Sequence, residues 1–189
     1  MVAKLGRLTT IYGPMFSGKT TYLIQIFRKT PSGVVFKPNL DTRYTERPVV
    51  VAHTKDEIPA TFVSYGDPTQ LLLLVGQHRF VFIDEVNFFS PDLVEVVQTL
   101  LGLGISVYAA GLVYDTEQQV WGPMERLIAL ADEKIEVFAR CDGEGGACLQ
   151  PATKSYRKIP SIAQVQVGGA GEYGACCAMH YQTLHQSIL

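Results

Sequence analysis

Three observations predict an α/β fold, in which a parallel sheet is flanked by helices and followed by a small C-terminal subdomain. Short apolar strands alternate with helical segments up to residue 139, a pattern typical of parallel sheets with right-handed crossovers. The first strand and helix enclose Gly13 to Thr20, which fits the phosphate-loop pattern G-x-x-x-x-G-K-[ST]. All four cysteines lie beyond residue 140, which sets that region apart. The core is therefore predicted to be phosphate-loop NTPase-like.

The phosphate loop lies between a strand predicted at residues 8–12 and a helix predicted over residues 21–29. Its glycines allow successive backbone N–H groups to point inward, and the helix adds its positive N-terminal end. Lys19 is expected to reach the β- and γ-phosphates of ATP, and the Thr20 hydroxyl is expected to bind Mg²⁺. The predicted ATP- and phosphate-binding residues are Gly13, Pro14, Met15, Phe16, Ser17, Gly18, Lys19, Thr20 and Thr21.

The composition fits one α/β core with a small appendage. The chain has 189 residues, of which 47% are hydrophobic and 18% are charged. A net charge of −2 argues against an electrostatic grip on DNA or RNA, and no apolar run approaches the ~20 residues of a membrane span. The N-terminus does not resemble a signal peptide. We expect a cytoplasmic protein without nucleic-acid or membrane partners, with a nucleotide-binding domain at 1–139 and a subdomain at 140–189.

The remaining elements follow in alternation. Strands are predicted at residues 33–37, 48–52, 80–85, 105–110 and 134–139, and helices at residues 68–75, 92–101 and 124–131. A polar loop with Asp41 and Arg43 leaves the carboxyl end of the second strand, where ligands bind in open α/β sheets. Spacing alone leaves two interpretations open for these two residues: an ordinary surface ion pair, or part of the site.

Two adjacent carboxylates follow the apolar strand that begins at Phe80. Asp84 is predicted to be the acid on the Mg²⁺ side, because phosphate-loop proteins hold the ion with such a carboxylate. Glu85 has two open interpretations. It either orients a water, as in an ATPase, or accepts a proton from a substrate hydroxyl, as in a kinase.

The polar stretch from Val113 to Pro123 is predicted to be a mobile lid. Gly111 and Gly122 lie at its ends as plausible hinges, and Trp121 is one of its few apolar anchors. Such a segment is expected to close over a bound substrate.

The cysteines are arranged like the ligands of a structural zinc site. Cys141 and Cys148 lie on a glycine-rich knuckle, and Cys177 with His180 forms a second pair nearly thirty residues later. Cys176 is a spare thiol that could replace Cys177. The alternative is that the four cysteines are simply small buried hydrophobic residues. A zinc ion here would fold a segment too small to fold alone.

These motifs resemble those of the zinc-containing, tetrameric thymidine kinases, and the resemblance covers nearly the whole chain. The loop G-P-M-F-S-G-K-T-T, the D-x-R-Y sequence at residues 41–44, and D-E-x-x-F-F at residues 84–89 are similar to motifs of that family. So are Gly111-Leu112 at the start of the lid, Val167-Gly168-Gly169 with Tyr173, and C-x-x-H-Y at residues 177–181.

The resemblance implies phosphorylation of the 5′-hydroxyl of thymidine by ATP, giving dTMP and ADP, in a homotetramer that uses Mg²⁺ and a structural Zn²⁺. It implies that Glu85 is the base that takes the hydroxyl proton, and that Thr20, Asp84 and Asp41 lie at Mg²⁺. The substrate-binding residues that it implies are Met15, Asp41, Arg43, Phe88, Leu112, Ser155, Val167, Gly168 and Tyr173. The implied zinc ligands are Cys141, Cys148, Cys177 and His180.

The chain departs from the family pattern mainly in the lid. Val113 replaces an aspartate, Thr116 replaces an aromatic residue, residues 117–119 replace basic residues, and Trp121 replaces a phenylalanine. The first cysteine pair is C-x6-C where the family has C-x2-C, and Ser155 replaces a threonine. The altered lid motivates an alternative function: a nucleotide-binding or ATPase-like regulator that has lost nucleoside phosphorylation.

Overall fold

A six-stranded parallel sheet forms the centre of the computed structural model, which describes residues 5–40, 49–52, 56–158 and 171–186. The strand order is β5-β2-β6-β7-β1-β8, and every neighbouring pair is parallel. The strands are β1 Leu8–Tyr12, β2 Gly33–Asn39, β5 Thr61–Ser64, β6 Phe80–Ile83, β7 Ser106–Gly111 and β8 Glu133–Glu136. The predicted parallel sheet flanked by helices is therefore confirmed.

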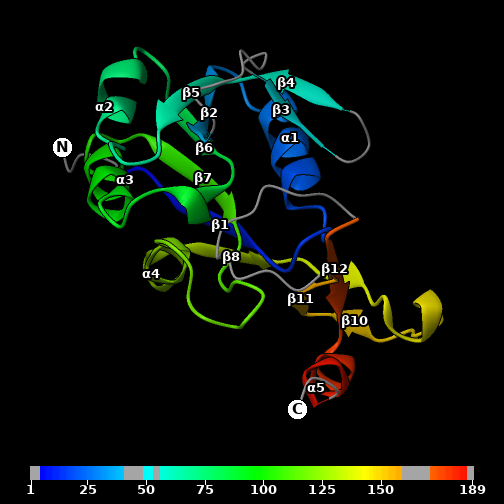
Figure 1. Cartoon of the computed structure of the whole chain (residues 1–189). Helices are drawn as coiled ribbons and strands as arrows, with labels where there is room; N and C mark the ends of the chain where they lie inside the picture. Colours follow the sequence, from blue (N-terminus) through cyan, green and yellow to red (C-terminus); the bar gives the residue numbers. More distant parts are fainter. Residues whose placement is uncertain (1–4, 41–48, 53–55, 159–170, 187–189) are drawn as a thin grey trace.

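Helices cover both faces of the sheet (Figure 1). They are α1 Lys19–Lys29 on one face and α2 Gln70–Leu74, α3 Leu93–Gly102 and α4 Met124–Leu130 on the other. Successive side chains of a strand point to opposite faces, so β6 contributes to two cores. Val81 and Ile83 pack in the core beneath α3, whereas Phe82 packs in the core beneath α1. There its ring stacks on Tyr108, with centroids 4.7 Å apart, and meets Phe27 edge-on at 5.3 Å.

Two features of the sheet differ from the prediction. The strand expected at residues 48–52 is β3 Val49–Val51, which pairs antiparallel with β4 Glu57–Pro59 outside the main sheet. The edge strand β5 was not predicted, because its sequence TFVS lacks the continuous apolar run of β6 and is too short to show an alternating pattern.

A subdomain with its own small core follows β8. It contains the antiparallel pairs β9 Ala139–Arg140 with β10 Pro151–Ala152 and β11 Lys154–Arg157 with β12 Tyr173–Cys176, then α5 Ala178–Gln186. Its core consists largely of cysteine and alanine side chains. Such a core buries little apolar area and needs another source of stability. Within the described part of the chain, no helix is both long and apolar enough to cross a membrane.

Candidate active site and metal cluster

The predicted phosphate loop connects β1 to α1 at the carboxyl edge of the sheet. Position 13 requires glycine, because a Cβ there would lie 1.9 Å from the carbonyl oxygen of Val137. Gly18 and Phe16 both adopt left-handed backbone conformations, with φ of 84° and 62°. Such turns form concave groups of N–H donors, and the N-terminus of α1 follows directly. The loop therefore has the local structure of an anion site.

Thr20, in the first turn of α1, faces Asp84 at the end of β6. The Thr20 Oγ1 atom lies 3.2 Å from each carboxylate oxygen of Asp84. Burial, and then the neighbouring Glu85 carboxylate, raise the pKa of Asp84 to about 7, while Lys37 of β2 and the Thr20 hydroxyl favour its ionised form. A hydroxyl and a carboxylate provide the oxygen ligands that Mg²⁺ prefers, so this pair fits such an ion.

Lys19 folds back onto its own loop. Its Nζ donates to the Pro14 carbonyl at 2.6 Å and to the Ser17 hydroxyl at 3.4 Å. Desolvation lowers the pKa of Lys19 to about 8, although Glu85 and Asp84 favour its charged form. Lys19 therefore remains mostly a cation at neutral pH, as phosphate binding requires.

Glu85 occupies a sharp turn between β6 and the short 3-10 helix η1, Val86–Phe88. Its backbone is left-handed, with φ 54° and ψ 42°, a conformation that costs a non-glycine residue of order 1–3 kcal/mol. In a continuous strand, Asp84 and Glu85 would point to opposite faces. The turn removes that constraint, so both carboxylates favour the charged form of Lys19, and Glu85 raises the pKa of Asp84. Two acids and one cation thus gather beside the phosphate loop.

Residues predicted to bind the nucleoside come from both parts of the chain. The Met15 N–H donates to Ser155 Oγ at 2.9 Å, which ties β11 to the phosphate loop across 140 positions of sequence. Leu112 and Tyr173 are buried, and Phe88 is half-buried. Four further predicted site residues lie outside the described residues: Asp41, Arg43, Val167 and Gly168.

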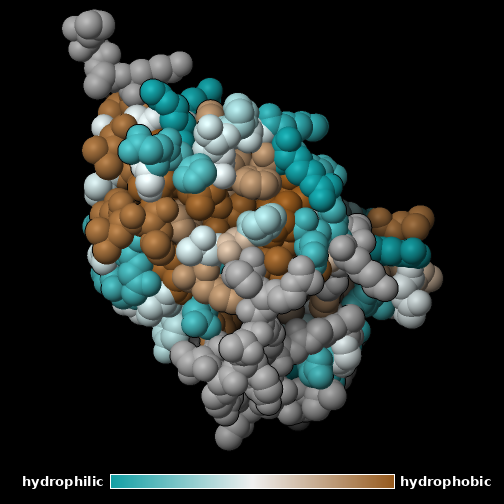
Figure 2. Space-filling view, turned by 90° about the horizontal axis from the view of Figure 1, so that it is seen from above, coloured by the Kyte–Doolittle hydropathy of each residue, from teal (hydrophilic) through white to brown (hydrophobic). Residues whose placement is uncertain are grey.

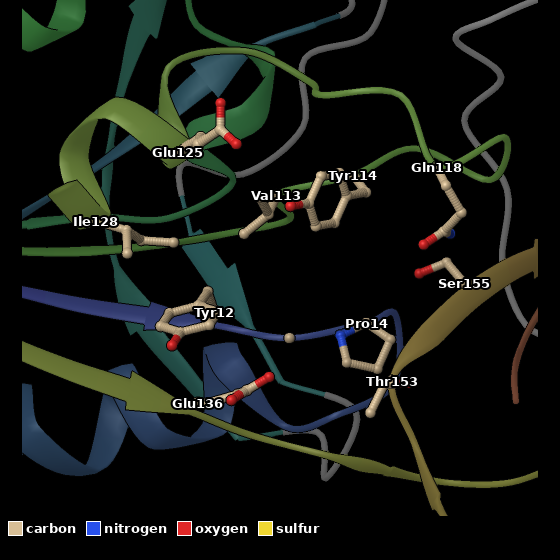
Figure 3. A pocket seen from close by; sticks show the side chains of 11 residues that line it. Tyr12, Pro14, Val113, Tyr114, Gln118, Glu125, Ile128, Glu136, Thr153 and Ser155 are labelled. Atoms are coloured by element: carbon tan, nitrogen blue, oxygen red, sulfur yellow. The ribbon is translucent and has the colours of Figure 1, made fainter. Parts of the chain in front are cut away.

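A cavity of about 300 Å³ adjoins the start of the phosphate loop (Figure 3). It lies between β1, α4, β11 and the stretch that follows β7, and its lining includes Tyr12, Pro14, Tyr114, Ile128 and Ser155. Its volume is at the lower end of the range for small-molecule pockets. Of the substrate-binding residues that the resemblance implies, Ser155 lines this cavity, whereas Met15, Phe88, Leu112 and Tyr173 do not.

Asn87 of η1 was not predicted as a functional residue. Its buried Oδ1 accepts the Leu112 N–H at 2.9 Å, and its carbonyl oxygen would lie 2.3 Å from a Cβ at Gly122. The next residue, Phe88, meets Trp121 edge-on, with ring centroids 4.7 Å apart. η1 therefore holds both ends of the predicted lid. Asn87 lies at the second unspecified position of D-E-x-x-F-F, and the motif does not distinguish it from an ordinary turn residue.

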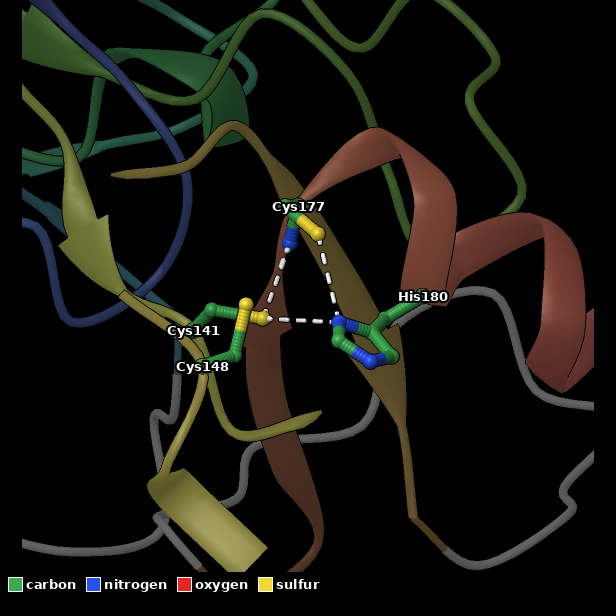
Figure 4. Close-up of side chains that lie close together, drawn as sticks. All are labelled: Cys141, Cys148, Cys177 and His180. Atoms are coloured by element: carbon green, nitrogen blue, oxygen red, sulfur yellow. Dashed lines mark hydrogen bonds between the residues drawn. The ribbon is translucent and has the colours of Figure 1, made fainter. Parts of the chain in front are cut away.

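The second cluster consists of the four predicted zinc ligands (Figure 4). The ligand atoms of Cys141, Cys148, Cys177 and His180 all lie within 4.8 Å of one another. His180 Nδ1 is 3.5 Å from the sulfur of Cys141 and 3.3 Å from that of Cys177. Usual zinc bond lengths in a tetrahedron place such a nitrogen and sulfur about 3.6 Å apart, so the residues fit a structural zinc ion.

The surroundings of Cys141 also suit a metal ligand. Burial raises the pKa of its thiol, but the N–H groups of Cys177 and Gly143 donate to the sulfur and the net shift is downward. Cys176 differs, because burial raises its pKa to about 12, which disfavours a thiolate. It also lies outside the four-residue cluster, so the geometry favours Cys177 over Cys176 as the ligand.

The fold and the loop together define an α/β protein of the phosphate-loop nucleotide-binding class, with a Cys3His cluster that could hold zinc. The family model described as thymidine kinase matches residues 6–181. The thymidine kinase of Porphyromonas gingivalis is 38% identical over 181 residues, covering 94% of this chain and 85% of the relative. That of Bacteroides fragilis is 36% identical, covering 94% and 87%, and that of Pseudothermotoga lettingae is 35% identical, covering 91% and 92%. The chain belongs to the thymidine kinase family.

Proposed function

We propose that this protein transfers the γ-phosphoryl group of ATP to the 5′-hydroxyl of thymidine, giving dTMP and ADP. Family membership supports the reaction, and one observation carries the chemistry: the Thr20 hydroxyl faces both carboxylate oxygens of Asp84 beside the phosphate loop. In phosphoryl transfer the protein contributes mainly position and charge. The residues grouped here are of the types that this chemistry needs.

Each residue has a separate proposed role. The loop N–H groups and Lys19 bind the phosphates, and Thr20 with Asp84 holds Mg²⁺, joined by Asp41. When bound, Mg²⁺ supplies positive charge to the phosphates. Glu85 accepts the proton of the 5′-hydroxyl, because it is half-buried and adjoins the acid that holds the ion.

The nucleoside pocket is proposed to combine Met15, Phe88, Leu112, Ser155 and Tyr173 with Arg43 and the Val167-Gly168 segment. The altered lid still brings an aromatic ring to this region, because Trp121 lies against Phe88.

We also propose that the protein forms a homotetramer in the cytoplasm. Exposed leucines on and near α2 and α3 support self-association: Leu73 is 83% exposed and Leu103 68%, and Figure 2 shows hydrophobic residues gathered on one side.

The test is ADP release and dTMP formation from ATP, each measured with and without thymidine. A kinase releases ADP only when thymidine is present and makes one dTMP per ADP. The Lys19→Ala variant is expected to lose both products while keeping the circular dichroism of the fold. ADP release that is independent of thymidine, without dTMP, would instead identify the ATPase-like alternative.

A further inference from the structure

The stretch from Val113 to Trp121, here called the lid hairpin, is closed by its own hydrogen bonds. The Trp121 N–H donates to the Val113 carbonyl at 2.9 Å, and Tyr114 pairs with Val120 in an antiparallel bridge. Asp115 is buried at the turn, where its Oδ1 accepts two backbone N–H groups at 2.9 Å each. The hairpin is therefore built to move as one body.

The lid hairpin is anchored at its base and at its tip. At the base, Asn87 holds Leu112 and the ring of Phe88 meets that of Trp121. At the tip, the hydroxyl of Tyr181 donates to the Thr116 carbonyl at 2.7 Å. That second contact joins positions 65 residues apart and comes from a different part of the fold, the first turns of α5.

Tyr181 is itself placed by the metal cluster. It directly follows His180, and its backbone N–H donates to the Cys177 carbonyl at 3.0 Å. Its ring packs against the small core that contains the three cysteine ligands. A continuous connection thus runs from Cys177 and His180, through the Tyr181 side chain, to the tip of the lid hairpin.

We propose that Tyr181 is a positioning residue whose hydroxyl fixes the tip of the lid hairpin, so that the metal cluster sets the hairpin's position and with it the affinity for the nucleoside. The link to affinity rests on the proposed function, in which the nucleoside binds beneath this segment. The Tyr181 hydroxyl donates to the lid hairpin, whereas Thr20 and Asp84 bind each other beside the phosphate loop. Loss of the hydroxyl should therefore affect nucleoside binding and spare ATP.

The test is Tyr181→Phe, which removes one oxygen and keeps the packed ring. The matched control is Tyr156→Phe, because that hydroxyl lies in the same subdomain but donates to Asp142, at 3.4 Å. Trp121 is the only tryptophan of the chain, so its fluorescence and acrylamide quenching report on the lid hairpin directly. Cleavage after Glu117 by a glutamate-specific protease gives a second readout without any substrate.

Losing the hydrogen bond to the Thr116 carbonyl, worth about 0.5–1.5 kcal/mol, corresponds to roughly 2- to 12-fold. We expect Tyr181→Phe to raise the KM for thymidine and the rate of cleavage at Glu117 by that factor. The KM for ATP and the zinc content should not change, and Tyr156→Phe should match the wild type. Unchanged Trp121 quenching and unchanged cleavage in Tyr181→Phe would overturn the proposal.

Zinc removal provides the second arm. A chelator should increase Trp121 quenching in the wild type but add little in Tyr181→Phe, because the connection is already broken. Equal increases in both proteins would contradict the role of Tyr181. These readouts need no substrate, so they decide the coupling even if the wild type makes no dTMP, a result that would refute the proposed function alone.

Discussion

Glu85 combines an unusual backbone with a position next to the acid proposed to hold Mg²⁺. Its left-handed backbone is a conformation that glycine adopts without strain, so the turn itself does not require a glutamate side chain. General-base catalysis contributes about 10²–10⁴-fold to a rate. We therefore expect Glu85→Gln to lower kcat by about that factor while ATP and thymidine bind almost as before.

The measurements for Glu85→Gln are steady-state kcat and binding of each substrate by calorimetry. Asp84→Asn is the matched comparison, since it should weaken Mg²⁺–ATP binding itself. A decrease in kcat below about 10-fold would mean that Glu85 only organises the site. Loss of ATP binding in Glu85→Gln would mean that the roles of the two carboxylates are exchanged.

Asp84 makes the stability of the metal-free protein depend on pH. Its pKa is about 7 in the folded chain against an ordinary value of 3.8. Between these values the native state binds a proton that the unfolded chain has released, so the stability contribution falls as pH rises from about 4 to 7. Each unit of pKa difference corresponds to about 1.4 kcal/mol.

Asp84→Asn removes this titration. We expect the variant to gain stability relative to the wild type as pH rises from 5 to 7, measured by urea unfolding without Mg²⁺ or nucleotide. The Cys3His cluster is the same in both proteins, so any effect of pH on it cancels in the difference. Parallel stability curves for the two proteins over this range would show that Asp84 is already ionised when the protein folds.

At the scale of elements, Gly122 determines how closely the lid hairpin approaches η1. Its φ is +66°, and a Cβ would lie 2.3 Å from the Asn87 carbonyl oxygen. Gly76 has a similar φ of +55° but nothing within 4 Å of a Cβ, so Gly76→Ala isolates the cost of the backbone conformation. That cost is about 1–2 kcal/mol.

Gly122→Ala is expected to lose a further ~1–3 kcal/mol, because the added methyl group forces the hairpin away from η1. Thermal unfolding measures the stability of both variants. The displacement should also raise the KM for thymidine in Gly122→Ala and leave it unchanged in Gly76→Ala. Equal losses of stability and equal KM values would show that the hairpin tolerates the displacement.

The elements that sequence predicted well are those whose signals are local. The loop from Gly13 to Thr20 and the strand before Asp84 are predicted from neighbouring residues alone. In the structure the strand ends at Ile83 and the helix begins at Lys19, each within two residues of the prediction. The alternation of strands and helices predicts a parallel sheet. In such a sheet the carboxyl ends of the strands meet at one edge, which places the phosphate loop and Asp84 there.

Contacts between distant residues were not predictable in the same way. The bond from Met15 to Ser155 spans 140 positions, and that from Tyr181 to Thr116 spans 65. Asn87 looks like an ordinary turn residue until the fold brings Leu112 to it. No periodicity or spacing encodes such pairs, because each depends on how whole elements pack. The cysteine cluster is an exception, since chemistry restricts which residue types can gather.

At the scale of the whole molecule, the subdomain is expected to depend on metal because its own core is small. Metal analysis should find one zinc per chain, and chelation should remove hydrogen-exchange protection from residues 139–158 and 171–186 before it affects β1, β6 and β7. The sheet has two large apolar cores, whereas the subdomain core is mainly cysteine and alanine.

Two cysteine variants test which thiol binds the metal: Cys177→Ser should lose the zinc, and Cys176→Ser should keep it. Zinc retained in Cys177→Ser, or simultaneous exchange throughout the chain after chelation, would contradict this division of stability.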